Sequence, residues 1–331
     1  MFFAESAQAL GSTPLFTRLM DQLRALAELR TPFLTAVMSA VTYLGQEMVF
    51  LVLGMILLWC VNKKYGYRYL GMFMLGSFLQ QFLKAIFAIP RPWVLDPTFE
   101  PVESAVKEAT GFSFPSGHTL TACVSLGGVA LYLKKAWAFL AAAVLTLLVA
   151  FSRMYLGVHT LLDVVVGLLL GALVLLFFWA VFLKNEDRPA VLNAVLSVSV
   201  ALCIGLLVYL TVSPSNVDPL GDGVKNAYVL VGAAVGMLLG KLIDDCFVRF
   251  ETEAPWWAQI IKVALGLILI LGIRFGLKTL FGGDNETALL RGVRYFAMSF
   301  IGVGLYPILF RVFPKSAKKH HRNENITVTN A

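Results

Sequence analysis

Three short clusters of charged and polar residues interrupt a chain that is otherwise strongly apolar. In chain order they are Lys84-x6-Arg91-Pro92, Pro115-Ser116-Gly117-His118 and Ser152-Arg153-x5-His159-x3-Asp163. Cations, histidines and a carboxylate are the residue types that hold phosphate and move protons during its transfer. We therefore expect these three clusters to carry the chemistry of the protein.

The first cluster offers two cations, Lys84 and Arg91, seven residues apart. Seven residues is close to two turns of helix, so both side chains point the same way if the helix continues to Pro90. Pro90 and Pro92 then end the helix and fix the course of the chain. Taken alone, the pair is more typical of basic residues that reach for the membrane surface from the end of a span.

The second cluster places Ser116 where it can cap the start of a helix. Gly117 lets an anion approach free backbone N–H groups, and the helix N-terminus adds a partial positive charge. This pattern favours a phosphate site in which His118 donates a proton to a leaving oxygen. The alternative is a capped helix start with an incidental histidine.

The third cluster pairs His159 with Asp163, and the i, i+4 spacing predicts that both lie on one helix face. A carboxylate bonded to one ring N–H fixes the tautomer and leaves the other nitrogen free to attack. A purely structural hydrogen bond is the alternative interpretation. A carboxylate near the start of an apolar helix is costly without a role, however, and this favours the catalytic interpretation.

The composition predicts the elements that position these clusters. Of 331 residues, 58% are hydrophobic and 14% are charged, whereas a soluble domain usually has about 25% charged residues. Several stretches of about 18 or more residues are nearly free of charge, so we predict an all-α, polytopic membrane helix bundle. Its nine transmembrane helices are expected at about residues 45–62, 69–89, 117–133, 136–152, 159–183, 190–212, 226–245, 256–277 and 291–313.

The net charge of +7 lies mostly in the short loops between these stretches. Membrane topology and contacts with anionic lipid explain it better than nucleic-acid binding does. The cytoplasmic side is marked by Lys63, Lys64, Arg68, Lys134, Lys135, Lys184, Arg188 and the C-terminal tail. The three clusters then meet on the extracytoplasmic side, although basic residues between positions 274 and 294 depart from the rule there.

The chain divides into four parts. They are an N-terminal interfacial amphipathic helix in residues 1–31, the membrane core in 32–184, an additional four-helix membrane region in 185–314 and a polar cytoplasmic tail in 315–331. Thr13 caps the amphipathic helix and Pro14 begins it. Its apolar face is expected to consist of Leu15, Leu19, Leu23 and Leu26. The first twelve residues do not have the pattern of a cleavable signal peptide.

Several other residues receive no chemical role. The cysteines Cys60, Cys123, Cys203 and Cys246 are scattered and predict neither a metal site nor a redox pair. Glycines repeat every fourth residue at Gly167 and Gly171, and at Gly232, Gly236 and Gly240, which predicts close helix packing. Residues interpreted as belonging to the interface or the solvated surface are Glu47, Trp93, Asp96, Glu100, Glu103 and Glu108, with two alternatives: Glu47 as a partner of the site residues, and the four acidic loop residues as a barrier to some anionic substrates. The four spans after residue 185 contain no recognisable chemical constellation.

The ordered series of three clusters resembles the type 2 phosphatidic acid phosphatase superfamily, over residues of about 32 to 184. The resemblance implies that His159 attacks phosphorus and is phosphorylated, oriented by Asp163, while His118 protonates the leaving group and then activates water. The groups implied to hold the phosphoryl oxygens are Lys84, Arg91, Ser116, Gly117 and Arg153. The family works without a metal, so neither a metal nor a cofactor is expected.

A site on span ends suits a substrate whose tail stays in lipid. We expect a phosphatase for a lipid-linked phosphate, either a polyprenyl diphosphate or a glycerolipid phosphate, in a bacterial plasma membrane. Alternatives are a phosphotransferase with the same intermediate, a phosphatase for a soluble phosphate, and a transporter or flippase that uses the last four spans, where Lys262 is the clearest charge. Membrane lipids are expected partners, nucleic acid is not, and the oligomeric state is not predicted.

Overall fold

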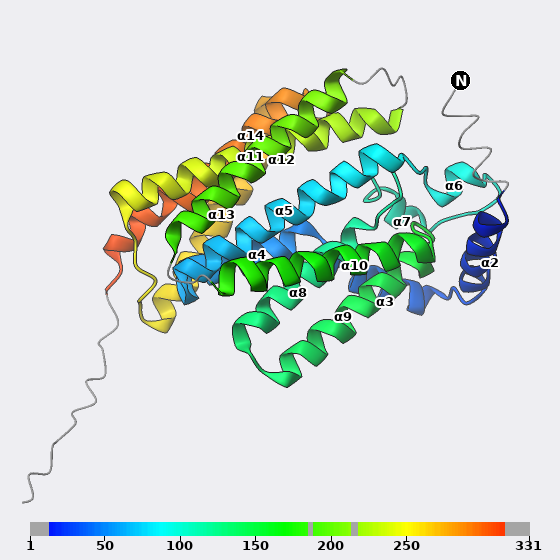
Figure 1. The fold of residues 1–331 in the computed structure, drawn as a ribbon, viewed down its shortest axis with the longest axis horizontal. Helices are drawn as coiled ribbons and strands as arrows, with labels where there is room; N and C mark the ends of the chain where they lie inside the picture. The colour runs from blue at the N-terminus through cyan, green and yellow to red at the C-terminus, as the bar shows by residue number, and fades with distance from the viewer. Residues whose placement is uncertain (1–12, 185–187, 213–217, 315–331) are drawn as a thin grey trace, which may run out of the picture.

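The computed structural model describes residues 13–184, 188–212 and 218–314, and the regular elements in these ranges are all helices (Figure 1). The boundary expected at residues 185–187 and the polar tail from residue 315 lie outside the described residues, as do the first twelve residues. The expected all-helical architecture is therefore confirmed for the part of the chain that is described.

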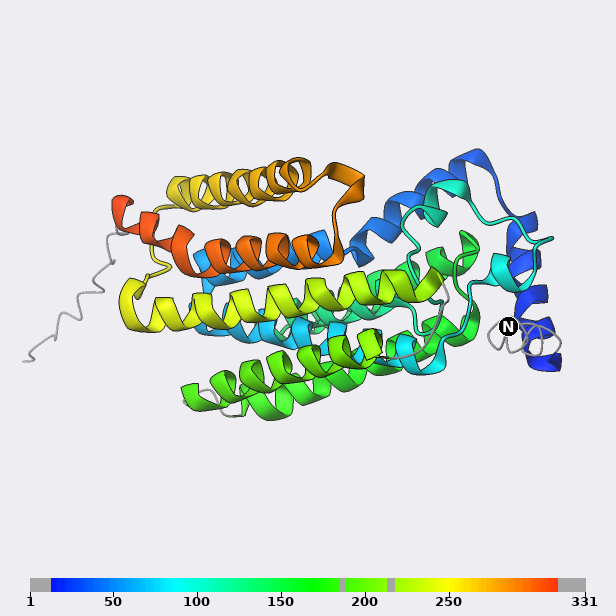
Figure 2. The same cartoon turned by 90° about the horizontal axis from the view of Figure 1, so that it is seen from above.

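The first described helix, α2 (Pro14–Glu28), lies across one end of the bundle (Figures 1 and 2). The Thr13 hydroxyl accepts a hydrogen bond from Phe16 N at 3.3 Å and Pro14 begins the helix, as predicted. Of the four leucines predicted for its apolar face, Leu23 is buried and Leu15 is 60% exposed. The buried face consists of Phe16, Met20 and Leu23, which pack with Phe99 of a later loop. Its position in the membrane interface stays a prediction.

The core follows as a series of helices, which alternate in direction from α4 onward. They are α3 (Pro32–Thr42), α4 (Glu47–Ile56) continued by a π-helical turn (Leu57–Val61), α5 (Lys63–Phe87), α8 (Gly117–Leu133), α9 (Ala136–Tyr155) and α10 (Leu161–Phe177) continued by a second π-helical turn (Phe178–Leu183). The loop between α5 and α8 contains two single-turn helices, α6 (Pro92–Leu95) and α7 (Glu103–Val106). The end of α5, the start of α8 and the turn from α9 to α10 consequently meet at one end of the bundle (Figure 1).

Four further long helices form the extension. They are α11 (Pro189–Val212), α12 (Asp218–Ile243), α13 (Trp256–Leu280) and α14 (Ala288–Phe300), and π-helical turns continue α12 over Asp244–Val248 and α14 over Ile301–Leu305. These helices lie side by side with the core in Figures 1 and 2. The two regions share one buried hydrophobic cluster, which includes Met72, Phe178, Leu206 and Met237. An ion pair of 2.6 Å between Lys63 and Asp244 ties the two regions together at the end opposite the clusters.

The glycine repeat of α12 brings two helices of the extension into backbone contact. A Cβ atom at Gly232 would lie 2.1 Å from the carbonyl oxygen of Gly292 on α14, and one at Gly236 would lie 2.6 Å from that of Phe296. No side chain fits into such spacing. The predicted packing role of these glycines is confirmed.

The expected number of nine spans is not confirmed. All nine expected segments are helical, but among the described residues seven helices are long and apolar enough to cross a membrane. An eighth is obtained if Pro32–Gly45 and Glu47–Val61, which are bent by 49° at their junction, count as one broken span. The helix Gly117–Leu133 has 17 residues, fewer than the roughly 20 that a hydrocarbon core of about 30 Å requires.

Of the basic residues that departed from the topology rule, Lys278, Arg291 and Arg294 have acidic partners, whereas Arg274 donates to the sulfur of Met48. Lys278 Nζ lies 2.8 Å from Asp284 Oδ1, and Arg294 Nη2 lies 2.6 Å from Glu286 Oε2. The cellular orientation of the bundle stays a prediction.

Candidate active site

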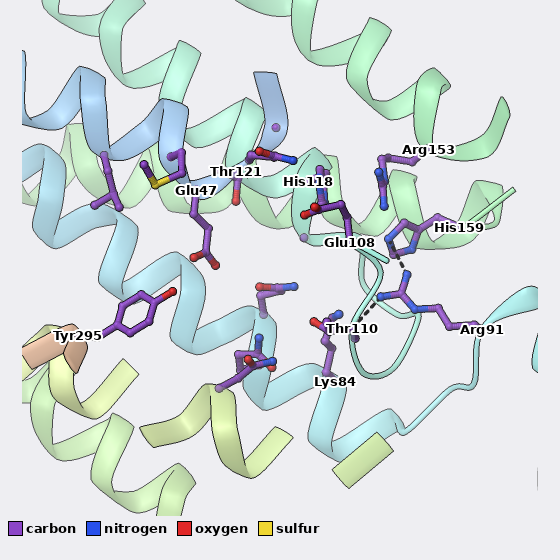
Figure 3. A pocket seen from close by; sticks show the side chains of 18 of the residues that line it. Glu47, Lys84, Arg91, Glu108, Thr110, His118, Thr121, Arg153, His159 and Tyr295 are labelled. Atoms are coloured by element: carbon purple, nitrogen blue, oxygen red, sulfur yellow. Dashed lines mark hydrogen bonds between the residues drawn. The ribbon is translucent and has the colours of Figure 1, made fainter. Parts of the chain in front are cut away.

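A polar cavity lies where the three clusters meet, between the core and the extension (Figure 3). The predicted residues that line it are Lys84, Arg91, Gly117, His118, Arg153 and His159. Two other predicted residues, Ser116 and Asp163, are buried behind this lining. The sequence clusters therefore converge, but their members occupy two layers.

His159 and Asp163 do not share a helix face, and the predicted geometry is wrong in this respect. His159 precedes α10, which begins at Leu161 with Thr160 as its N-cap. Asp163 is the third helical residue, and its Oδ2 accepts a hydrogen bond from Thr160 N at 2.7 Å in a capping box. The cap carries Asp163 back toward the imidazole, so that His159 Nδ1 lies 3.5 Å from Asp163 Oδ2.

Ser113 connects the same pair. Its hydroxyl donates to Asp163 Oδ2 at 2.7 Å and lies 3.5 Å from His159 Nδ1. Ser113 N in turn donates to the carbonyl oxygen of Ile89 at 2.8 Å. The carboxylate is thus fixed by two short hydrogen bonds and faces the imidazole from a rigid position.

The contact of Arg91 assigns the tautomer of His159. Arg91 Nη1 lies 3.0 Å from His159 Nε2 (Figure 3), and a guanidinium can only donate. Nε2 must therefore accept, so it carries a lone pair, and the proton resides on Nδ1 beside Asp163. The unprotonated nitrogen is the one that faces the cavity.

Backbone carbonyls hold Arg91 in place. Its guanidinium donates to Gly111 O at 3.0 Å, Thr110 O at 2.8 Å and Val158 O at 3.0 Å. The predicted continuation of the helix to Pro90 is wrong, because α5 ends at Phe87 and Ala88 adopts a left-handed conformation with φ of 47°. Arg91 reaches the cavity from a loop, and this carbonyl cradle replaces the helix as its support.

The serine cluster is also arranged differently from the prediction. Ser116 occupies the N-cap position of α8, but its side chain makes no capping bond and accepts from the Thr119 hydroxyl at 3.0 Å. Gly117 is the residue that lines the cavity, next to Gln80, whose Nε2 would lie 2.4 Å from a Cβ atom at this position. A side chain at this position would displace the Gln80 amide and fill space at the helix N-terminus.

His118 and Arg153 present unpaired donors. Within the described part of the protein, His118 Nε2 and the Nε and Nη2 atoms of Arg153 are buried without a hydrogen-bond partner. Arg153 Nη1 donates to the Thr42 hydroxyl at 2.8 Å, which fixes the guanidinium plane. Buried polar groups are rarely left unpaired, so this arrangement favours an anionic ligand.

The electrostatic environment keeps His159 neutral. Burial, followed by the positive charges of Arg91, Arg153 and Lys84, lowers the pKa of His159 well below its ordinary value. A neutral imidazole with an accepting nitrogen is the form that can act as a nucleophile. Among the described residues, no group of three His, Cys, Asp or Glu side chains is arranged to hold a metal ion.

Several lining residues were not predicted for this site. From the core they are Gln80, Gln81, Glu108 and Thr110, and from the extension they are Asn226, Arg274, Tyr295 and Met298. Glu47, for which a place beside the site was the second alternative, also lines the cavity. Glu47 and Glu108 had been interpreted as interface and surface residues, and the spans after residue 185 as free of chemistry. The extension also reaches the site through Asp222, whose Oδ2 accepts from Gly111 N at 3.3 Å. No sequence signal marks these contacts, since they arise from helix packing.

Comparison with known families gives two matches. Residues 65–187 match the PAP2 superfamily, and residues 228–319 match a family described as PAP2 superfamily phosphatase, transmembrane extension. The first match contains all three clusters, and the second covers most of α12 and all of α13 and α14.

Individual relatives are lipid phosphatases by name. The undecaprenyl-diphosphatase of Sulfolobus acidocaldarius is 33% identical over 158 residues, which cover 46% of this chain and 70% of the relative. Phosphatidylglycerophosphatase B of Bacillus subtilis is 34% identical over 166 residues, 47% of this chain and 77% of the relative. Sphingosine-1-phosphate phosphatase 1 of Rattus norvegicus is 25% identical over 252 residues, 70% of this chain and 57% of the relative.

Among solved structures, a PAP2-type phosphatidylglycerolphosphate phosphatase from Bacillus subtilis is similar, with a TM-score of 0.46 and 25% identity. The similarity covers 57% of this chain and 94% of that structure.

Proposed function

The chain belongs to the PAP2 superfamily of membrane phosphatases, and on this premise we propose that it hydrolyses the phosphate of a membrane lipid through a phosphohistidine at His159. The observation that carries the proposal is the 3.0 Å contact between Arg91 Nη1 and His159 Nε2, which places the imidazole proton on Nδ1 and the lone pair on Nε2, where a phosphoryl group can replace the Arg91 N–H. Around this nitrogen lie the unpaired donors of His118 and Arg153. A phosphoryl group between them would satisfy these donors.

In the first step, the Nε2 lone pair of His159 forms a bond to phosphorus while the bond from phosphorus to the leaving oxygen breaks. His118 gives a proton to that oxygen, so the leaving group departs as the lipid alcohol, or as a singly protonated lipid monophosphate if the substrate is a diphosphate. Asp163 stabilises the positive charge that develops on the imidazole and keeps its Nδ1 proton in place. The negative charge of the bound phosphate favours the protonated form of His118 before transfer.

In the second step, His118 accepts a proton from water, and the water oxygen bonds to phosphorus as the bond to Nε2 breaks. Inorganic phosphate leaves and both imidazoles return to their starting forms. Lys84, Arg91 and Arg153 stabilise the phosphoryl oxygens in both steps, and fixed cations of this kind contribute about 3–4 kcal/mol each to lowering a barrier. Gly117 gives the phosphate access to the start of α8.

The proposed substrate is a polyprenyl diphosphate or a glycerolipid phosphate, whose tail stays in the bilayer while its phosphate enters from the membrane surface. This proposal agrees with the names of the undecaprenyl-diphosphatase and phosphatidylglycerophosphatase relatives. We also propose that residues 32–184 form the catalytic core, that residues 185–314 form the extension, and that the site faces the extracytoplasmic side.

The decisive experiment measures phosphate release by the purified protein in detergent from polyprenyl diphosphate, phosphatidic acid, phosphatidylglycerophosphate and a sugar phosphate. His159→Ala should lose at least about 10⁴-fold in rate. His320→Ala, a histidine of the C-terminal tail, is the matched control and should keep full activity. Activity that survives in His159→Ala would contradict the nucleophile, and absence of release from every substrate by folded protein would favour transfer or transport.

A second substrate separates the roles of the two histidines. Dinitrophenyl phosphate has a leaving group that needs no proton, so His118→Asn should still release one dinitrophenolate per enzyme and accumulate phosphoenzyme. With a lipid alcohol as leaving group, the same variant should be nearly inactive. If His118→Asn is equally impaired with both substrates, His118 is not the general acid.

A further inference from the structure

An apolar cavity adjoins the polar one and lies between the core and the extension. Its lining residues are Met48, Leu51, Val52, Met55, Leu70, Met74, Ala233, Met237, Leu267, Ile270, Leu271, Tyr295, Met298, Ser299 and Val303. These residues come from α4, α5, α12, α13 and the helix formed by α14 and its π-helical turn. Two helices of the core and three of the extension therefore enclose it.

The two cavities share part of their walls. Met48, Leu51, Tyr295 and Met298 line both of them. Tyr295 marks the boundary, because its hydroxyl points into the polar cavity in the direction of Glu47 (Figure 3), while its side chain also borders the apolar space. A molecule with a polar head and an apolar chain can occupy both spaces at once.

The apolar cavity descends from the catalytic end toward the middle of the bundle. On α4 its lining runs from Met48 to Met55 away from the site, which at 1.5 Å per residue is about 10 Å. On the helix that continues α14 it runs from Tyr295 to Val303, about 12 Å in the same direction. This direction is the one that a lipid chain takes when its phosphate lies at the membrane boundary.

Five of the chain's ten methionines line this cavity, at positions 48, 55, 74, 237 and 298. Methionine is unbranched and polarizable, so it adapts to ligands of irregular shape. Such a lining favours a flexible hydrocarbon chain over a rigid ligand.

We propose that the apolar cavity holds the first part of the hydrocarbon chain of the lipid phosphate substrate, so that the extension forms one wall of the tail-binding site. The proposal rests on the proposed phosphatase function. An extended chain advances roughly 1.25 Å per carbon when C–C bonds are about 1.5 Å long and meet at tetrahedral angles. A depth of about 10 to 12 Å therefore accommodates roughly eight to ten carbons.

The test uses a series of alkyl monophosphates with two to sixteen carbons, each below its micelle concentration. Up to about fourfold gain in kcat/KM is expected for each added methylene, until the profile levels off at eight to ten carbons. A flat profile, or one that rises evenly to sixteen carbons, would overturn the proposal, since the second result describes simple partition into detergent.

Two variants and a matched control locate the effect. Leu267→Trp narrows the deep end of the cavity, and should lower the ratio of kcat/KM for decyl phosphate over ethyl phosphate at least about tenfold. Leu265→Trp places the same ring on the same helix at a position that is 49% exposed, and should leave the ratio unchanged. Met237→Ala widens the cavity and should move the plateau to longer chains, which keeps the test available if Leu267→Trp does not fold.

Failure of this inference is distinguishable from failure of the proposed function. If His159→Ala still hydrolyses both ethyl and decyl phosphate, the phosphohistidine mechanism is wrong. If hydrolysis requires His159 but Leu267→Trp and Leu265→Trp have the same chain-length profile, the mechanism stands and the tail site is wrong. In that case the apolar cavity holds a structural lipid or none.

Discussion

The core and the extension line one cavity, but they hold their polar side chains in different ways. In the core, Arg91 is fixed by three backbone carbonyls and by His159, and Asp163 is fixed by Ser113 and Thr160. In the extension, Arg274 donates to the sulfur of Met48 at 3.1 Å, and a thioether is a weak acceptor. The core therefore fixes Arg91 and Asp163 by strong bonds, whereas the extension leaves Arg274 free to exchange partners.

This difference assigns separate tasks to the two walls. Atoms that stabilise a transition state must be held rigidly, because any reorganisation during the reaction raises the barrier. Groups that select among lipid headgroups and chains benefit from adjustment instead. Changes in the core should mainly lower kcat, and changes in the extension should mainly raise KM.

The largest effect within the core is expected for Asp163→Asn. The amide can still accept from Thr160 N, so the cap and the fold are retained, but the carboxylate charge opposite His159 Nδ1 is lost. Because the developing imidazolium then has no counter-charge and the tautomer is no longer fixed, kcat should fall about 10³- to 10⁴-fold. Phosphate release and the thermal unfolding temperature are the measurements.

Ser113→Ala is the control for this variant. It removes one hydrogen bond to Asp163 but leaves the charge, so a loss of about tenfold in kcat is expected. If Asp163→Asn lowers kcat no more than Ser113→Ala does, then Asp163 has only the structural role of capping α10. The rigid placement of its carboxylate in the core would then not contribute to catalysis.

The next effect compares one arginine from each wall. Arg153→Gln removes two unpaired donors from the phosphate cavity, so kcat should fall about 10²- to 10³-fold. Arg274→Gln removes the cation of the extension, so KM for a lipid phosphate should rise up to about tenfold while kcat changes less than about twofold. Full kinetic curves with the same substrate separate the two outcomes.

A loss of kcat in Arg274→Gln as large as that in Arg153→Gln would show that the extension takes part in the chemistry. Unchanged kinetics in Arg274→Gln would show that Arg274 does not contribute to substrate binding. Either result would change the assignment of tasks to the two walls.

The sequence predicted well that the three clusters converge, because their members lie close to helix ends. Membrane topology brings those ends together whatever the details of the loops, which is why His118, Arg153 and His159 line the cavity as expected. The supporting geometry was not predictable, because it depends on irregular backbone. The left-handed conformation of Ala88 decides where Arg91 lies, and the cap at Thr160 decides where Asp163 lies. Neither feature can be predicted from residue spacing along a regular helix.

The contribution of the extension was missed for a different reason. Asn226, Arg274 and Tyr295 lie on three separate helices, and no motif connects them. Only the packing of α12 and α14 through their glycines, and of both regions around one apolar core, sets these residues opposite the histidines. The same packing makes Glu47 part of the cavity, where the sequence predicted a residue of the membrane interface.

The smallest effect expected is that of acid on the first chemical step. Burial and the charges of Arg91, Arg153 and Lys84 lower the pKa of His159, so the imidazole stays neutral as the pH falls through its ordinary value of 6.5. An unperturbed imidazole would be about three-quarters protonated at pH 6.0. In His118→Asn, which lacks the other imidazole of the site, the burst rate with dinitrophenyl phosphate should change less than about twofold between pH 7.5 and 6.0.

The extension provides the control for this measurement, because its buried ion pair between Arg294 and Glu286 titrates outside this pH range. Hydrogen bonds from Arg294 lower the pKa of Glu286 below its ordinary value of 4.5, so the stability that this pair adds is lost only in stronger acid. This ion pair therefore keeps its contribution to stability between pH 7.5 and 6.0. A burst that falls fourfold across this range, in protein whose unfolding temperature is constant, would mean that the cations of the core do not act on His159. The rigid arrangement around its nucleophilic nitrogen would then have to be rejected.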